Sequence, residues 1–252
     1  QLALIREKTP QHADKVVFLD SLPDAFDGVI IGNEVLDAMA SEVMRWTENG
    51  IEQMGVSIVD DQFAWTQRPV SDERILAEAL RIQPDKQPYT SELHLNQTAF
   101  IATLAQKLVR GAIIMIDYGF DEAQYYHPQR SMGTLIGHYR HHVVDDPFFW
   151  PGLMDLTCHV NFTAMAQAAV DNDLDLIGYT SQAHFLFNLG ITEVLLAEHP
   201  DVNSKEYLQA ASAMQKLVAP HEMGELFKVI AMGKGVDVDW QGFANGDWCH
   251  KL

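Results

Sequence analysis

The sequence has little cysteine and no long apolar run, and each shortage excludes a class of protein. Its two cysteines, Cys158 and Cys249, are too few and too far apart for a disulfide framework or a structural zinc site. No apolar segment approaches the about 20 residues that a membrane helix needs, and no charged-then-apolar leader opens the chain. We therefore expect a soluble protein of a reducing compartment, without membrane insertion.

Basic side chains are also scarce. Only 17 Lys and Arg oppose 35 Asp and Glu, and the formal net charge is −18. Such a field repels the phosphates of nucleic acids and the headgroups of anionic lipids. The charge therefore argues against a nucleic-acid partner and suits a cationic one, such as a basic protein segment or an arginine side chain.

What the sequence does contain is an apolar fraction of 47% in 252 residues, enough to form the core of a single domain spanning residues 1–252. Short β-branched runs alternate with segments of helical spacing, which predicts an α/β fold with a mostly parallel, doubly wound sheet. The predicted strands are residues 15–22, 28–34, 111–120, 175–182 and 226–235. The predicted helices are residues 71–82, with Ser71 as the cap, 96–109, 161–174, 183–199 and 204–219.

Two segments interrupt this alternation. Residues 41–70 alternate polar and apolar side chains around two turns, which predicts an inserted antiparallel meander. Residues 121–160 are rich in Tyr, His, Pro and Gly without a clear period, and we expect them to form a lid. The opening letters, QLALIREKTPQ, are typical of the last turns of a helix, so further sequence is expected upstream.

Polar residues directly follow two of the predicted strands. Asn33, Glu34 and Asp37 follow the first, and Asp117 and Tyr118 end the second. Ligands of doubly wound sheets bind outside the carboxyl ends of strands, so these five residues are expected to lie together. A structural reading stays open for two of them, because Asp37 could complement a helix dipole and Asp117 could form a turn.

Two more polar groups also allow a structural reading. Ser91 and Glu92 stand just before a predicted helix. Helix capping is the preferred interpretation of Ser91, and the role of Glu92 stays open between compensation of the helix dipole and a function. A histidine- and aspartate-rich segment follows, with His138, His141, His142, Asp145, Asp146, Asp155 and His159. Their spacing matches no metal-binding signature, so we predict no metal, although metal-assisted hydrolysis stays a competing hypothesis.

Eight motifs occur in a fixed order: GNEVLDAM, YTSEL, IDYG, GTL, DDPFFWPGLMDLTCHVNFT, GYTSQAHFL, LFKVIAMGKG and GFANGD. As a set, they make the chain from near Val16 to its C-terminus resemble the MidA family. Members of that family are S-adenosylmethionine-dependent methyltransferases, including a mitochondrial respiratory complex I assembly factor that acts on a protein arginine. The resemblance implies a class I methyltransferase fold. Its glycine-rich loop and acidic ribose-binding residue would lie upstream of Gln1, so we expect the main cofactor grip to be missing here.

The resemblance also implies roles for single residues. The expected contacts of S-adenosylmethionine are Asp20, Ser21, Leu22 and Gly32. The expected catalytic residues are Asn33, Glu34, Asp37 and Glu92, because carboxylates that grip a guanidinium leave its other nitrogen free to attack. The expected substrate-binding residues are Asp117, Tyr118, His142, Asp155 and His159, with the lid closing over the acceptor to exclude water.

Two departures from the family pattern are visible. Asn161 stands where the family usually has an acid, which argues against an acid/base role there, and Ala40 stands where a proline often follows. The leading hypothesis is a protein arginine methyltransferase whose substrate is a respiratory-chain subunit, in the cytoplasm of a bacterium or the mitochondrial matrix of a eukaryote. A binding or assembly factor that retains the fold without needing the chemistry is the alternative. A homodimer is left open.

Overall fold

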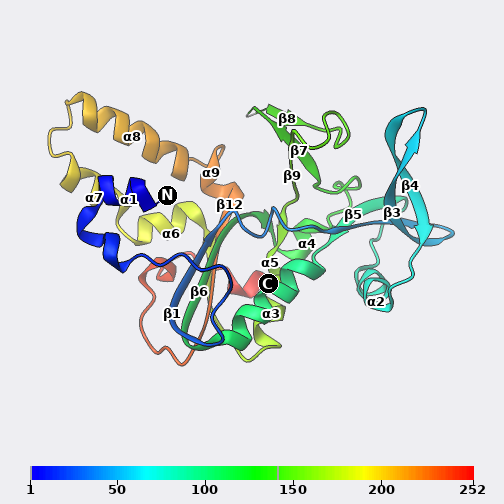
Figure 1. Cartoon of the computed structure of the whole chain (residues 1–252), viewed down its shortest axis with the longest axis horizontal. Helices are drawn as coiled ribbons and strands as arrows, with labels where there is room; N and C mark the ends of the chain where they lie inside the picture. The colour runs from blue at the N-terminus through cyan, green and yellow to red at the C-terminus, as the bar shows by residue number, and fades with distance from the viewer. Residues whose placement is uncertain (1, 141) are drawn as a thin grey trace.

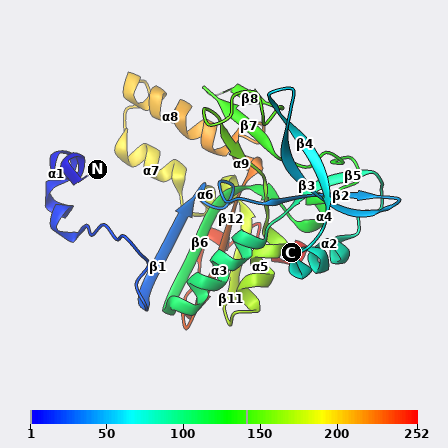
Figure 2. The same cartoon turned by 45° about the vertical axis from the view of Figure 1, so that its right-hand side comes forward.

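The computed structural model describes residues 2–140 and 142–252, and a central five-stranded sheet organises them. Its strands lie in the order β1 (Phe26–Asn33), β6 (Leu108–Phe120), β12 (Phe227–Lys234) and β11 (Asp175–Ser181), and β10 (Val160–Asn161) pairs with the end of β6. β12 runs antiparallel to both of its neighbours, whereas β1 and β10 run parallel to β6. The mainly parallel α/β sheet predicted from the sequence is therefore confirmed (Figures 1 and 2).

Helices cover both faces of the sheet at its central strand β6, which is why this strand is apolar on both sides, whereas Val29 and Ile31 of the edge strand β1 are exposed. Ile113 and Met115 of β6 pack in one core with α3 (Leu95–Lys107) and α5 (Phe162–Val170). The alternate residues Ile114 and Ile116 pack in a second core with α6 (Gln182–Asn188) and the short helix η2 (Gln241–Phe243). A strand with two apolar faces thus fixes the centre of the fold.

A second sheet is antiparallel throughout, in the order β4 (Gln62–Pro69), β3 (Gly50–Val59), β2 (Glu42–Thr47) and β5 (Tyr89–Leu93). β2 to β4 occupy the segment in which the sequence predicts a meander, and their hairpin extends away from the central sheet (Figure 1). One face packs against α2 (Glu73–Ile82), where Trp46 Nε1 donates a hydrogen bond to the Ala79 carbonyl at 2.9 Å. The opposite face is turned to the segment predicted to be a lid.

That segment begins with α4 (Glu122–Tyr125) and contains a three-stranded sheet of β8 (His142–Val144), β7 (Ile136–Tyr139) and β9 (Asp155–Thr157), in that order. The limits of both insertions stay predictions. The remaining elements are α1 (Leu2–Lys8), η1 (Pro10–Lys15), α7 (Ile191–Glu198), α8 (Lys205–Val218), α9 (Met223–Leu226) and η3 (Cys249–Lys251). Within the described ranges, no helix combines the length and apolar character needed to cross a bilayer.

The strand predicted at residues 15–22 is wrong. Residues 16–25 have no regular structure, and Val17, Phe18 and Leu19 are 73%, 54% and 65% exposed. A strand forms only where its backbone groups find a partner, and in the described chain this run has no strand beside it. An apolar pattern alone could not show that the pairing was absent.

Two helix predictions also need correction. The helix predicted at residues 183–199 is divided into α6 and α7, because Gly190 adopts a left-handed conformation (φ +77°) between them. The start of α2 is capped by Asp72, not by Ser71, since the Asp72 side chain accepts a hydrogen bond from the Arg74 amide at 2.8 Å.

Candidate functional site

The polar ends of β1 and β6 lie next to each other. The two strands are parallel neighbours with Asn33 opposite Ile116, and the Glu34 amide donates to the Ile116 carbonyl at 2.9 Å. Glu34 then turns the chain with a φ of +50°, a conformation that costs a non-glycine residue free energy. Asn33 Nδ2 donates to Glu34 Oε1 at 3.2 Å, and both side chains are exposed.

Asp117, the residue after Ile116, holds that turn from inside the protein. Its Oδ2 accepts from the amides of Leu36 and Asp37 at 3.0 and 3.2 Å, and its Oδ1 accepts from the Tyr118 amide at 2.9 Å. Burial, followed by the nearby Asp37, raises the pKa of Asp117 to about 7, although the three backbone donors lower it in part. Asp117 therefore has the contacts of a group that positions the Glu34 turn.

Asp37 is also inside. Its Oδ2 accepts a 2.6 Å hydrogen bond from the Tyr118 hydroxyl, and its Oδ1 is buried without a partner among the residues that the structure describes. Burial, and then this bond, raise the pKa of Tyr118 above its ordinary value, so the phenol stays protonated and donates. The structure thus brings Asn33, Glu34, Asp37, Asp117 and Tyr118 together, as their positions after the two strands predict.

His159 joins this group from the far end of the lid segment. Its ring stacks on Phe120 with centroids 5.1 Å apart and meets Tyr118 edge-on at 5.2 Å. Burial, together with Arg130 and Lys228, lowers the pKa of His159 to about 4, so the ring is neutral near neutral pH. Its Nδ1 is buried and has no hydrogen-bond partner within residues 2–140 and 142–252.

Glu92 lies elsewhere than predicted. Ser91 and Glu92 belong to the short strand β5 and cap no helix, because His94 is the N-cap residue of α3. The Glu92 carboxylate is 1% exposed and accepts hydrogen bonds from the backbone of residues 134 and 135. β5 is an edge strand of the antiparallel sheet. The Glu92 side chain lies on the face of this sheet that is turned to the lid, where residues 134 and 135 contact it.

Other predicted residues lie apart from the strand ends. His142 and Asp155 are exposed on β8 and β9. Asp20, Ser21 and Leu22 follow no strand, contrary to the prediction, and all three are exposed. Gly32 is buried, and a Cβ there would lie 2.5 Å from Met115 Sδ, so a larger residue would have to displace the Met115 side chain.

Of the two departures from the family pattern, Asn161 has a structural role, and Ala40 contributes a contact of its backbone only. Asn161 is the N-cap residue of α5: its Oδ1 accepts from the Ala164 amide at 3.2 Å, and its Nδ2 donates to Glu122 Oε2 at 3.4 Å. The Ala40 carbonyl accepts a 2.7 Å hydrogen bond from Asn96 Nδ2.

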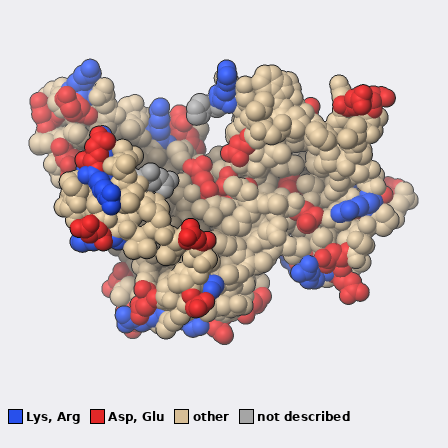
Figure 3. All heavy atoms as spheres, viewed as in Figure 1, with Lys and Arg blue, Asp and Glu red and all other residues tan. Residues whose placement is uncertain are grey.

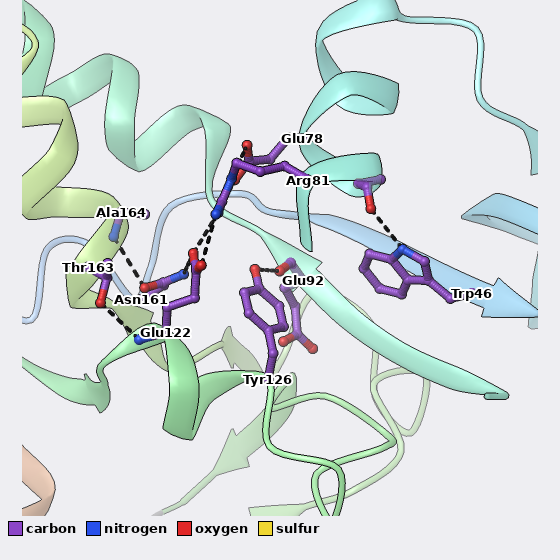
Figure 4. A network of polar contacts seen from close by, with 10 residues as sticks. Trp46, Glu78, Arg81, Glu92, Glu122, Tyr126, Asn161, Thr163 and Ala164 are labelled. Carbon is purple, nitrogen blue, oxygen red and sulfur yellow. Dashed lines mark hydrogen bonds and ion pairs between the residues drawn. The ribbon is translucent and has the colours of Figure 1, made fainter. Parts of the chain in front are cut away.

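A polar network beside α5 was not predicted. Arg81 Nη2 lies 2.5 Å from Glu122 Oε2 and 2.8 Å from Glu78 Oε1, and the same Glu122 oxygen accepts from Asn161 (Figure 4). Their side chains line a cavity of about 650 Å³ between α2, α3 and α5. The spacing of Glu78 and Arg81 on a predicted helix indicates an ion pair between them. The contact with Glu122 could not be predicted in this way, because Glu122 is 41 residues from Arg81.

Lys228 was also missed, although a lysine within the apolar run FKVIAM is a visible signal. It lies opposite Asp117 on β12, and burial lowers its pKa to about 8. Within residues 2–140 and 142–252, no three His, Cys, Asp or Glu side chains group as a metal site would require. His141, part of the histidine-rich segment, lies outside the described residues.

Comparisons with known proteins were made for the sequence and for the fold. Residues 1–180 match a family model described as "Putative S-adenosyl-L-methionine-dependent methyltransferase". The solved structure of an uncharacterized protein from Burkholderia thailandensis is 45% identical, with a TM-score of 0.94 over 100% of this chain and 67% of its own. Another from the same organism, bound to S-adenosyl-homocysteine, is 45% identical, with a TM-score of 0.93 over 99% of this chain and 64% of its own.

Curated relatives are more distant. Protein arginine methyltransferase NDUFAF7, mitochondrial, from Danio rerio is 28% identical over 224 residues, which are 85% of this chain and 49% of that protein. Its homologue from Caenorhabditis elegans is 26% identical over 178 residues, 69% of this chain and 39% of that protein. The chain therefore spans about half the length, or less, of these curated relatives.

Proposed function

The chain belongs to the family of S-adenosyl-L-methionine-dependent methyltransferases that its first 180 residues match, and on that premise we propose that the protein methylates a protein arginine. One observation carries the methyl-transfer part: a solved structure 45% identical over 99% of this chain binds S-adenosyl-homocysteine, the form of the cofactor that remains after transfer. The names of the two curated relatives support arginine as the acceptor.

The exposed end of β1 fits the cofactor chemically. Asn33 and Glu34 present an amide and a carboxylate at a strand end, where they can accept from the ammonium and hydroxyl groups that S-adenosylmethionine carries. When bound there, the cofactor supplies an electrophilic methyl group. Asp117 keeps this turn in place through the amides of Leu36 and Asp37.

An arginine acceptor suits the same group of residues. A guanidinium forms short, charge-assisted hydrogen bonds with carboxylates, and Glu34 has its carboxylate at the surface. Methylation of a guanidinium nitrogen releases a proton from that nitrogen, and Glu34 is the carboxylate we assign to accept it. Acidic side chains outnumber basic ones on the face drawn in Figure 3, in keeping with the net charge of −18, and favour the approach of a basic segment.

The test combines cofactor binding with transfer. Calorimetric titration with S-adenosylmethionine is made on this chain and on the longest natural form of the protein, followed by transfer of labelled methyl groups to candidate proteins. Glu34→Gln is expected to lower kcat about 100-fold, the usual size for loss of a proton acceptor. Glu48→Gln, an exposed change in the β2–β3 turn, is the matched control. Equal label incorporation by Glu34→Gln and the wild type would refute the role of Glu34.

The alternative function, a binding or assembly factor, is supported by the surface of the lid. Phe149 and Trp150 are 53% and 43% exposed and stack on each other at 5.6 Å. Two variants test this function: Asn33→Ala, chosen to abolish cofactor binding, and Phe149→Ser on the lid. A partner complex that still forms with Asn33→Ala but no longer forms with Phe149→Ser would support it. A respiratory-chain subunit as substrate stays part of the proposal, and so does the location: the mitochondrial matrix, in line with the names of the relatives, for a eukaryotic protein and the cytoplasm for a bacterial one.

A further inference from the structure

We propose that Glu92 is a positioning residue that fastens both ends of the lid, residues 121–160, to the sheet beside the strand ends, and that it does not grip the acceptor. The kinetic part of this proposal rests on the proposed function. Its structural part rests on contacts within the chain alone.

The Glu92 carboxylate has no oxygen free for a substrate. Oε1 accepts from the amides of Thr134 and Leu135 at 2.9 and 3.0 Å. Oε2 accepts from the Tyr125 hydroxyl at 2.7 Å and from the Thr134 hydroxyl at 3.1 Å. The Ser91 hydroxyl is a fifth, more distant donor, at 3.5 Å from Oε2. A carboxylate has about four lone-pair sites, and these donors fill them. A guanidinium could bind Glu92 only by displacing the lid backbone.

The charge of Glu92 is balanced by donors that belong to the lid. None of the ion pairs among the described residues includes Glu92, although its side chain is 1% exposed. Successive backbone amides form a concave site for an anion, and here they come from residues 134 and 135. Gly133 makes the approach possible: its φ is +77°, and a Cβ there would lie 2.2 Å from Glu92 Oε1. This contact accounts for the GTL motif.

The same carboxylate reaches the other end of the lid through Thr134. The Thr134 hydroxyl donates to Glu92 and accepts from the His159 amide at 3.0 Å. His159 packs against Tyr118, which in turn donates to Asp37. A continuous series of contacts therefore leads from Glu92 to the strand-end residues.

The fastened segment also forms one wall of a cavity of about 720 Å³ between the antiparallel sheet and the lid. Glu92, Gly133 and Leu135 line its inner end, where sheet and lid meet. At another part of the boundary, Phe148 of the lid contacts Trp65 of β4 with ring centroids 5.0 Å apart. The position of residues 133–135 thus sets the width of a space in which the acceptor can bind under the lid.

Amide hydrogen exchange tests the fastening directly. In Glu92→Gln, one acceptor oxygen becomes a donor, and exchange of the Thr134 and Leu135 amides is expected to rise about 10- to 100-fold, as for loss of a hydrogen bond to a charged acceptor. Glu48→Gln, in the exposed turn between β2 and β3 of the same sheet, is the matched control and should leave these amides unchanged. Unchanged exchange in Glu92→Gln would overturn the proposal.

Thr134→Val keeps the charge of Glu92 and both backbone donors, and it decides the question if Glu92→Gln does not fold. It removes only the hydroxyl between Glu92 and His159, so the His159 amide is expected to exchange about 10-fold faster while the Leu135 amide changes little. Equal exchange of the His159 amide in this variant and the wild type would overturn the link between the two ends of the lid.

Kinetics separates positioning from chemistry. With the lid loosened, Glu92→Gln is expected to raise the KM for the acceptor protein about 10-fold, with kcat within about 3-fold and cofactor affinity unchanged. A fall in kcat at unchanged amide exchange would show Glu92 acting on the reacting groups and would overturn the proposal. Absence of methyl transfer by the wild type would refute the proposed function, while the exchange measurements would still decide the role of Glu92.

Discussion

Asp117 makes the stability of the folded chain depend on pH in an unusual direction. Its pKa is about 7 in the folded protein, against 3.8 for an aspartate in an unfolded chain, so the folded state binds the proton more tightly than the unfolded state does. The free energy of unfolding should therefore fall as pH rises from about 4 to about 7, because the carboxylate must then be ionised inside the protein. At about 1.4 kcal/mol per pKa unit, the cost is on the order of 4 kcal/mol above pH 7.

Two buried histidines act in the opposite direction. The pKa values of His94 and His159 are lowered to about 3 and about 4, mainly by burial, so that the unfolded state binds protons more tightly than the folded one. These groups increase stability as pH rises toward 6.5, and they would mask Asp117 in the wild-type profile. The informative quantity is therefore the difference between the wild type and Asp117→Asn, in which the histidine contributions cancel.

The assay is urea unfolding followed by tryptophan fluorescence at several pH values from 4.5 to 7.5. In Asp117→Asn the side-chain carbonyl can still accept from the Leu36 and Asp37 amides, but the new NH₂ group would face the Tyr118 amide, a loss of about 1 kcal/mol that does not vary with pH. Apart from that constant loss, the free energy of unfolding of Asp117→Asn is expected to increase relative to that of the wild type as pH rises. A difference that is flat over this range, or that changes in the opposite sense, would refute the assignment.

Two other substitutions test single contacts. Gly133→Ala places a Cβ against Glu92 and requires a left-handed alanine, so it should lower the free energy of unfolding by about 2 to 3 kcal/mol. The assay is urea unfolding. Gly152→Ala is the control, since Gly152 has a similar φ but open space around it. Asn161→Ala removes the α5 cap and should cost about 1 kcal/mol by the same assay, whereas an unchanged midpoint would show that the cap contributes nothing.

The centre of the fold could be predicted because its signal is local. β1 and β6 are apolar runs that end in polar residues, and parallel neighbours bring such ends together, which placed Glu34 beside Asp117. Residues 15–22 have a similar pattern but form no strand. Whether an apolar run forms a strand depends on a paired neighbour, and that information is not contained in the run itself.

The environment of Glu92 could not be predicted for a different reason. β5 has only five residues and precedes a helix directly, so its sequence is equally compatible with a cap. The donors to Glu92 lie 33 to 43 residues further along the chain. Such contacts depend on how the lid folds back onto the sheet. The spacing of apolar and polar residues within a short segment carries no information about this.

The acidic residues near the strand ends differ in what their oxygens already bind, and this difference separates their tasks. Asp117 accepts from three backbone amides, two of them in the Glu34 turn, and Glu92 accepts from two amides of the lid. Each uses its oxygens as hydrogen-bond acceptors to hold a segment, because a buried polar group needs donors to replace the water it has lost. Glu34, by contrast, is exposed and bonded to the neighbouring Asn33. Asp117 is buried and fixes the turn that carries the exposed Glu34, and this gives the arrangement that preorganised chemistry requires: a rigid support beneath a group free to bind.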